Sequence, residues 1–293
     1  LGLDENDLRK TDALAKAKAV YEGILGGVSL NSLPAAEKAA DKESPGKAAT
    51  AEYALPTVAP ENIAAFCKAN QITENALFTA AFSLLLARMD GSDEALFASI
   101  YNGRTRLETM RIMGMLVKTY PIYVSCDRGA NTKDFLLGVQ KRIQDLTAND
   151  LYSFAEAVRD FDVNADVLFA YQGDTFSGFT VAGQKAAEIT QPLEDAKEPL
   201  SVDVFKKDGK YIVSFEYRRD MYNDAQMRWM ADAYGMILCG LMTRETLGEI
   251  PMLSEVAASF LNAANDTDVP VPFRPAHCLM EASAAQYPDR VRS

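Results

Sequence analysis

The residues that could act as a nucleophile and its base stand side by side near the carboxyl end of the chain. His277 is the single histidine of the sequence, and Cys278 follows it directly. Neighbouring residues project their side chains in different directions, so this pair is poorly placed for proton transfer from thiol to imidazole. One histidine also excludes zinc sites built from several imidazoles. The favoured interpretation is an incidental imidazole beside a half-buried thiol.

The other three cysteines are too far apart to form a short metal-binding or redox motif. Cys67, Cys126 and Cys239 share no C-x-x-C spacing, a pattern typical of buried thiols in a reducing compartment. Cys67 follows Phe66 and Cys239 follows Leu238. We therefore expect these thiols to pack in the core.

Clustered charged side chains are the remaining candidates for chemistry. Paired acids could exchange protons with a substrate, but without an apolar pocket to raise a pKa they are more often solvated surface groups. Three nearby arginines predict either a salt-bridged loop or an anchor at an interface. No glycine-rich loop has the spacing that binds phosphate, so spacing alone indicates no catalytic set. The acids are Asp93-Glu94, Asp160/Asp162 and Glu194-Asp195, and the arginines are Arg104, Arg106 and Arg111.

The charge and the apolar content of the sequence indicate which classes of partner the protein does not bind. The 293 residues include 30 Lys and Arg against 41 Asp and Glu, a net charge of −11, so the surface repels nucleic-acid backbones and anionic lipid. No apolar run approaches the roughly 20 residues that cross a bilayer, and the polar first residues do not resemble a signal peptide. We therefore expect a cytoplasmic protein that binds neither nucleic acid nor membranes. A first residue other than Met suggests a piece of a longer protein.

Apolar residues at helical spacing predict most of the helices that would position these side chains. Two stretches lack that spacing: residues 32–51, rich in Ala, Lys and Glu, and the Pro-rich residues 268–275, which we interpret as linkers. The predicted helices cover residues 7–25, stopped by Gly26-Gly27; 61–69; 74–89, with Thr73 as N-cap; about 132–146, with Thr132 as cap; 224–242, begun by Asn223 or Asp224; and a short segment after Ser254.

Strands are predicted where apolar residues run together or alternate. Residues 95–101 and 166–172 indicate buried strands, and residues 113–124 an extended stretch in which Pro121 favours an edge or a bulge. Two alternating runs around Asp208-Gly209 predict a hairpin. Because helices and strands mingle without strict alternation, the predicted fold class is α/β: a two-layer sandwich with a mixed, largely antiparallel sheet flanked by helices.

Taken in order, these segments resemble the carboxy-terminal lobe of a condensation domain from nonribosomal peptide synthetases. Residues 73–99 are similar to that family's helix–strand unit, and Gly103-Arg104 to the Gly-Arg that closes it. Residues 113–119, MGMLVKT, are similar to the signature Ile-Gly-x-Phe-Val-Asn-Thr. There Gly114, Val117 and Thr119 match, and Lys118 replaces the asparagine. Residues 149–156, 199–205 and 216–222 resemble three later motifs, the first of them with departures.

Both ends of the chain fit the same resemblance. Residues 265–291 look like the bridge from a condensation domain into the first helix of an adenylation domain, and residues 1–45 like the crossover out of an amino-terminal lobe. The resemblance thus implies three segments. Residues 1–50 would be the crossover, residues 51–255 the carboxy-terminal lobe, and residues 256–293 the linker and the start of an adenylation domain.

The resemblance implies amide-bond formation. An acyl or peptidyl thioester on one carrier protein would be attacked by the amine of an aminoacyl thioester on another, each held on a phosphopantetheine arm, with no cofactor or metal bound by this chain. The fold would be half of the two-lobed chloramphenicol-acetyltransferase-like superfamily. That family's His-His-x-x-x-Asp-Gly motif lies on the amino-terminal lobe and is absent from this sequence. We therefore expect a fragment without catalytic residues, inactive alone.

By the same resemblance, Gly103, Arg104, Gly114, Val117 and Thr119 are structural residues of the substrate tunnel. Arg104 matches the arginine that pairs with the motif's aspartate, so we expect it to support the tunnel wall and to do no chemistry. The expected partners are carrier-protein domains, an adjacent adenylation domain and the missing lobe. A separated lobe exposes the face on which its partner packs, so self-association is also expected.

Two other functions stay open at this point. A degenerate condensation-like lobe could dock carrier or adenylation domains without chemistry. A coenzyme A-dependent acyltransferase of the same superfamily would share the fold, although the adenylation-like residues 265–291 have no use in a stand-alone acyltransferase.

Overall fold

Helix α4 (Glu74–Met89) lies at the centre of the fold in the computed structural model. Every residue from Ala76 to Ala87 is buried, as is typical of a helix enclosed by protein on all sides. The Thr73 hydroxyl accepts a hydrogen bond from the Ala76 backbone N–H at 3.1 Å, which confirms the predicted N-cap. The structure describes residues 2–36, 46–55, 59–104, 107–110, 112–174, 180–181, 183–185, 194–267 and 275–288.

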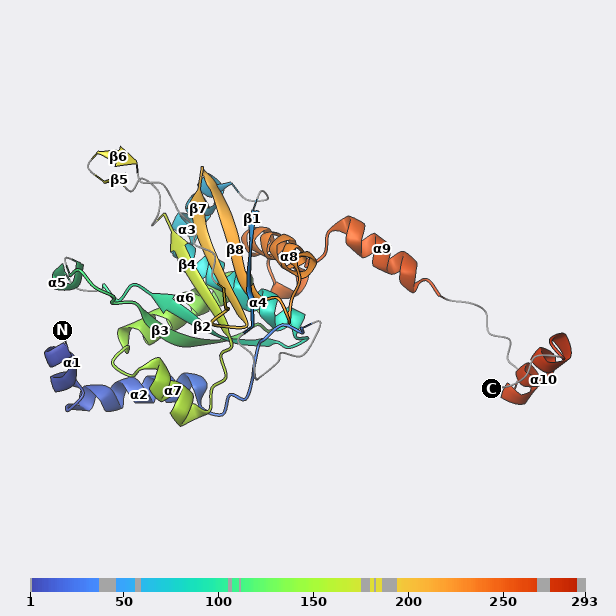
Figure 1. The fold of residues 1–293 in the computed structure, drawn as a ribbon, viewed down its shortest axis with the longest axis horizontal. Helices are drawn as coiled ribbons and strands as arrows, with labels where there is room; N and C mark the ends of the chain where they lie inside the picture. The colour runs from blue at the N-terminus through green and yellow to red at the C-terminus, as the bar shows by residue number, and fades with distance from the viewer. Residues whose placement is uncertain are drawn as a thin grey trace. The chain divides into compact units, whose positions relative to one another are not determined.

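A six-stranded mixed sheet packs against this helix (Figure 1). Its strand order is β1–β8–β7–β4–β2–β3, with antiparallel pairs β1/β8, β8/β7 and β2/β3, and with β4 parallel to both β7 and β2. The mixed sheet and the β7–β8 hairpin were both predicted. The strands are β1 (Ala48–Ala54), β2 (Glu94–Tyr101), β3 (Lys118–Ser125), β4 (Val167–Gly173), β7 (Leu200–Lys207) and β8 (Lys210–Arg218), beside a separate pair, β5 (Thr180–Val181) and β6 (Gln184–Lys185).

Helices on the sheet complete the second layer. α6 (Thr132–Ala148), α8 (Asp224–Thr243) and α3 (Pro60–Asn70) all pack against α4. Between α4 and the sheet, the ring of Phe82 stacks on Phe169 with centroids 4.7 Å apart and meets Phe97 edge-on at 5.2 Å. Such pairs add to the free energy gained from apolar burial. The two-layer α/β architecture is therefore confirmed.

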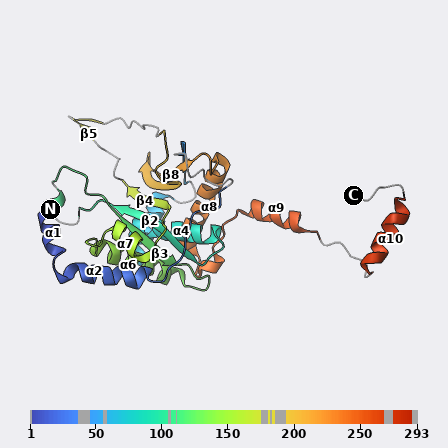
Figure 2. The ribbon, with the colours of Figure 1, turned by 60° about the horizontal axis from the view of Figure 1, so that its bottom comes forward.

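The segment before β1 is attached to this core. Helix α2 (Asp12–Leu25) lies against α6 and α7 (Phe154–Phe161), as both views show (Figures 1 and 2). Further along, the buried Ser32 hydroxyl accepts a hydrogen bond from the Leu96 backbone N–H at 2.9 Å. The Tyr222 hydroxyl donates to the Pro34 carbonyl at 2.8 Å. These contacts fix residues 32–34 to β2 and to the turn between β8 and α8.

Three predicted boundaries are wrong. The single helix over residues 7–25 is two helices, α1 (Gly2–Leu8) and α2, because the Thr11 side chain caps α2 from an extended backbone. The stretch 113–124 becomes a strand only from Lys118, the first residue that pairs with β2. The cap of α6 is Asn131, whose side-chain oxygen accepts hydrogen bonds from two backbone N–H groups, and Thr132 is the first helical residue.

The linker predicted over residues 32–51 is wrong in its last part. β1 begins at Ala48 and pairs along its whole length with β8. Its sequence, AATAEYA, contains one large apolar residue, Tyr53. Residues 48–54 therefore form a strand because they pair with a strand that is distant in the sequence, and not because of a local apolar pattern. Pro121 lies on β3, an edge strand of the sheet, where a missing N–H is tolerated.

Residues 253–293 form a second compact unit. It contains α9 (Glu255–Asn265) and α10 (Ala276–Gln286), and the side chains of Val256 and Phe260 on α9 are 81% and 73% exposed. The predicted Pro-rich linker lies outside the described residues except for Pro275. Two short helices of the first unit complete the architecture, α5 (Leu107–Met110) and the 3-10 turn η1 (Leu247–Glu249).

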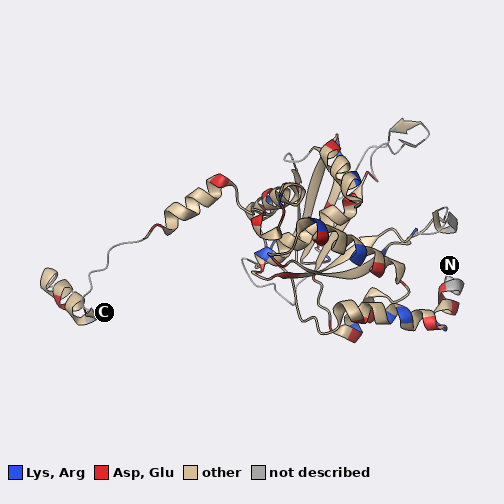
Figure 3. Cartoon of the chain, turned by 180° about the vertical axis from the view of Figure 1, so that it is seen from behind, with Lys and Arg blue, Asp and Glu red and all other residues tan. Residues whose placement is uncertain are grey.

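Charged residues of both signs are interspersed along the helices (Figure 3). No helix in the described ranges is long and apolar enough to span a membrane.

Candidate functional site

The site begins where β2 ends and the chain turns toward β3. Gly103 has φ +65°, and a Cβ built on it would lie 1.9 Å from the Leu116 carbonyl oxygen. Both features require glycine, since other residues disfavour this backbone and need the space that Leu116 occupies. The close approach brings the chain before β3 against the end of β2.

Arg104 fastens the loop between these strands. Its guanidinium donates to the Gly114 carbonyl at 3.0 Å and to the Ile112 carbonyl at 3.3 Å. Its own backbone N–H donates to the Asn102 side chain at 3.0 Å. Arg104 is half-buried, so these carbonyls replace part of its water shell. Arg106 and Arg111, the other members of the predicted cluster, lie outside the described residues.

Val117 and Thr119 follow this loop into β3. Val117 is 42% exposed, and Thr119 pairs with Ile100 across the β2–β3 ladder. Gly114 is exposed. The structure thus places all five site residues predicted by resemblance at one end of the β2–β3 pair.

A charged cluster stands on the first residue of β3. The Lys118 ammonium lies 2.7 Å from a Glu5 carboxylate oxygen and 3.0 Å from an Asp150 carboxylate oxygen. Partial burial lowers the pKa of Lys118, but hydrogen bonds and charges from Glu5 and Asp150 outweigh it and raise that pKa above its ordinary value. The Tyr101 hydroxyl also donates to Asp150. Four segments meet here: α1, the end of β2, β3 and the turn after α6.

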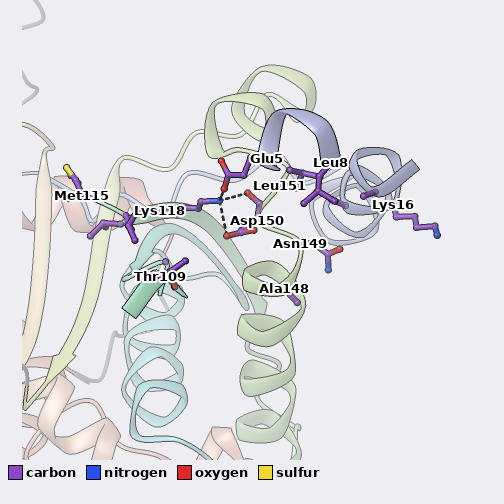
Figure 4. A pocket seen from close by; sticks show the side chains of 15 residues that line it. Glu5, Leu8, Lys16, Thr109, Met115, Lys118, Ala148, Asn149, Asp150 and Leu151 are labelled. Atoms are coloured by element: carbon purple, nitrogen blue, oxygen red, sulfur yellow. Dashed lines mark hydrogen bonds and ion pairs between the residues drawn. The ribbon is translucent and has the colours of Figure 1, made fainter. Parts of the chain in front are cut away.

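Two cavities flank this cluster. One has a volume of about 500 Å³ and is lined in part by Gly103 and by residues 115–117, and Figure 4 shows Lys118, Glu5 and Asp150 in its wall. The other, about 400 Å³, is lined by Thr119 and by aromatic rings. Four residues line both cavities: Glu5, Lys118, Asp150 and Leu151.

Sequence reasoning identified Lys118 as a departure from a motif but missed Glu5, Asp150 and Tyr101. Each of these three is an ordinary polar residue in its own local pattern. Only the packing of α1 and of the turn after α6 brings them together. No sequence spacing indicates that contact.

The weak motif at residues 149–156 has a structural role here. Asn149 ends α6, and its side-chain amide donates to the Asp145 carbonyl at 2.7 Å. Ser153 and Glu156 form a reciprocal capping box at the start of α7. The Arg9 guanidinium donates to Glu156 and, at 2.7 Å, to the Leu151 carbonyl. The Ser-x-x-Glu spacing of Ser153 and Glu156 is the sequence pattern that marks the start of α7.

The four cysteines and the histidine are not among the residues that line these cavities. Burial raises the pKa of Cys67 to about 11 and that of Cys126 to about 12, so both are neutral thiols near pH 7. The prediction that Cys239 packs in the core is wrong, because it faces outward from α8 and is exposed. His277 and Cys278 lie on α10 in the second unit, and neither lines either cavity.

One acid of each predicted pair is engaged in an ion pair. Asp160 pairs with Lys18 at 2.8 Å and with Arg159 at 2.8 Å. Asp195 pairs with Lys47 at 2.9 Å and Asp93 with Arg128 at 3.8 Å. Within the described ranges, no group of three or more His, Cys, Asp or Glu side chains is arranged to hold a metal ion.

Comparison with known sequences gives a consistent result. A family model described as the condensation domain matches residues 4–261. Nonribosomal peptide synthetase atnA of Emericella nidulans is 25% identical over 299 residues, covering 96% of this chain. Nonribosomal peptide synthetase 5 of Aspergillus fumigatus is 28% identical over 185 residues, covering 59% of it. The matches span 4% and 8% of those two proteins.

Solved structures share the fold. The first condensation domain of the CDA synthetase superposes with a TM-score of 0.69 at 12% identity, covering 86% of this chain and 56% of that one. The condensation domain from the monacolin K polyketide synthase MokA has a TM-score of 0.68 at 16% identity, covering 83% and 60%. The X-domain of teicoplanin biosynthesis, solved in complex with OxyB, has a TM-score of 0.69 at 11% identity, covering 86% and 59%. At such identities the likeness shows the fold alone.

Proposed function

Since the chain belongs to the condensation-domain family of nonribosomal peptide synthetases, we propose that it supplies the carboxy-terminal lobe of a domain that joins carrier-bound thioesters through an amide bond. The single observation that carries this proposal is the family match over residues 4–261. The α/β fold shared with solved condensation domains supports it.

The reaction needs an amine, a thioester and a place where both meet. The neutral amine nitrogen of the acceptor attacks the thioester carbonyl of the donor. The amide C–N bond forms, the C–S bond breaks, and the amine proton leaves as the carrier thiol is regenerated. Both substrates would arrive on phosphopantetheine arms of carrier-protein domains. Residues that move the proton would come from a His-His-x-x-x-Asp-Gly motif, and this chain holds one histidine, His277.

The chain's own contribution would be the shape of the substrate cleft. Gly103 allows the close approach to Leu116, and Arg104 holds the loop carbonyls of Ile112 and Gly114. Together with Val117 and Thr119, these residues would form a wall of the tunnel. Since their contacts are made with backbone and neighbouring strands, we assign them structural roles and no chemical step.

The same proposal assigns three segments to the chain. Residues 1–50 would cross from an amino-terminal lobe, residues 51–255 would form the carboxy-terminal lobe, and residues 256–293 would lead into an adenylation domain. We place this protein in the cytoplasm, where scattered thiols stay reduced. A lobe without its partner would also self-associate through the face that its partner covers.

The test is amide formation between two carrier proteins, one loaded with an acyl thioester and one with an aminoacyl thioester, followed by mass spectrometry. The chain alone should give no amide above the rate without protein. The chain joined to the segment encoded upstream of it should give amide product. Replacing the second histidine of the upstream motif with alanine should abolish that product.

A second function, docking without chemistry, is favoured by one observation. Lys118 occupies the position of the motif's asparagine and is engaged with Glu5 and Asp150, so the cleft differs from the family pattern there. The X-domain is an example of this fold in complex with another protein. A joined protein that binds loaded carriers yet forms no amide would establish docking and overturn the condensation proposal. A coenzyme A-dependent acyltransferase would instead consume acyl-coenzyme A when that thioester replaces the acyl-loaded carrier protein in the assay.

A further inference from the structure

Helices α1 and α2 are held to the protein by different forces. α2 buries Ala17, Tyr21 and Leu25, so the hydrophobic effect fixes it. In α1, the described side chains are Glu5, which is half-buried, and Asn6, Asp7 and Leu8, which are exposed. Among the side chains that the structure describes, those of α2 are held by apolar burial, whereas those of α1 are half-buried and charged or exposed.

The chain between these helices is pinned at one residue. Arg9 donates to the Leu151 carbonyl and to Glu156 at the start of α7. Directly after it, the Thr11 hydroxyl accepts a hydrogen bond from the Ala13 backbone N–H and begins α2. These contacts make residues 9–11 a fixed pivot, and α1 extends from it.

Among the described side chains of α1, Glu5 contacts the sheet through an ion pair. Its carboxylate lies 2.7 Å from the Lys118 ammonium, and the two side chains are 46% and 31% exposed. If Glu5 withdraws, Lys118 keeps its pairing with Asp150 at 3.0 Å, and Glu5 regains water. Release thus leaves no buried charge without a partner, and at a partly exposed site such an ion pair is worth little.

Glu5 also stands between the two cavities. It is the residue of α1 that lines both of them, whereas Lys118, Asp150 and Leu151 belong to the sheet and to the turn after α6. Figure 4 shows Glu5 and Asp150 on either side of the Lys118 ammonium. Lys118, Asp150 and Leu151 would stay in the shared wall, so withdrawal of Glu5 would open only its α1 side, between spaces of about 500 and 400 Å³.

We propose that α1 is a hinged cover, pivoting at residues 9–11 and fastened by the Glu5–Lys118 ion pair, whose opening removes the α1 side of the wall that the two cavities share. The walls that remain when α1 opens have an apolar and aromatic lining, contributed by Val117, Tyr101, Tyr120 and Tyr152. That lining suits an extended ligand with an apolar body. The inference rests on the contacts of α1 and does not depend on the proposed function.

Electron-spin distance measurements on the full chain test this movement. Spin labels at Asn6→Cys on α1 and Gln144→Cys on α6, in a background with Cys239→Ser and Cys278→Ser, report the position of α1. Glu5→Gln should increase the population at longer distance about threefold, the change expected when one partly exposed ion pair is lost. A second label pair, Ala19→Cys with Gln144→Cys, should keep its distance because α2 does not move.

The matched control is Asp7→Asn. It removes a carboxylate from the same helix, but Asp7 pairs with Lys10, and both side chains are 75% exposed. Asp7→Asn should leave the α1 distances unchanged. The cover is overturned if Glu5→Gln leaves the α1 distances as in the parent, if Asp7→Asn shifts them equally, or if the α2 pair shifts together with α1.

Discussion

Gly103 is a site residue that the backbone allows to be only glycine. Its positive φ and its contact with the Leu116 carbonyl are separate constraints, and each can be isolated. Gly91, in the turn after α4, has the same φ of +65° but nothing within 4 Å of the position of a Cβ. The two glycines therefore form a matched pair.

Gly103→Ala should destabilise the protein by about 3 kcal/mol, from left-handed strain together with overpacking. Gly91→Ala should cost about 1 kcal/mol, from strain alone. Urea denaturation of both variants measures the two values. Equal losses of stability would show that Leu116 moves aside and that the close approach does not shape the site.

Lys118 is a site residue whose position could be predicted from the sequence but whose contacts could not. The motif identifies the position, and the substitution of lysine for asparagine is visible in the sequence. Its partners are not, because Glu5 and Asp150 lie on other elements. The replacement of the motif's asparagine by Lys118 therefore indicates where the charged cluster lies. It does not predict that Glu5 and Asp150 belong to that cluster.

At the scale of elements, α7 is fastened by its first turn. Ser153 caps the helix, and Glu156 accepts hydrogen bonds from Ser153 and from Arg9. Partial burial raises the pKa of Glu156, but the hydrogen bonds from Arg9 and Ser153 outweigh it and lower that pKa to about 2. A carboxyl whose pKa is lower in the folded state stabilises the fold while it is ionised.

The stabilising effect of Glu156 should therefore be complete above about pH 4.5 and be lost as the pH falls toward 2. Glu156→Gln, which can still cap but does not titrate, should be less stable than the parent by about 1–2 kcal/mol at pH 6. The two proteins should converge near pH 2. Urea denaturation across this range measures the difference, and a difference independent of pH would contradict the assigned role.

Elements defined by their own residues were predicted well. α3, α4, α8 and the β7–β8 hairpin carry apolar periodicity, caps or a turn within their own sequence. β1 was missed because its own sequence lacks an apolar strand pattern, and its hydrogen bonds to the distant strand β8 stabilise it instead. The helix over residues 7–25 was joined in error because helical spacing continues across Thr11, although the cap interrupts the helix there.

At the scale of the molecule, composition and topology support the same class of protein. A net charge of −11 opposes binding to nucleic acid or anionic lipid, and the mixed sheet with α4 beneath it is the fold of the solved condensation domains. The chain covers 56% and 60% of two of those structures. We propose that the catalytic motif implied by the family belongs to residues outside this sequence.

The most direct measurement is to read the coding sequence immediately upstream of the codon for Leu1. The account predicts an open reading frame that encodes His-His-x-x-x-Asp-Gly, so that this chain completes a condensation domain. A start codon at that point, or a motif whose second histidine is replaced, would contradict the condensation function and leave docking as the role of this fold.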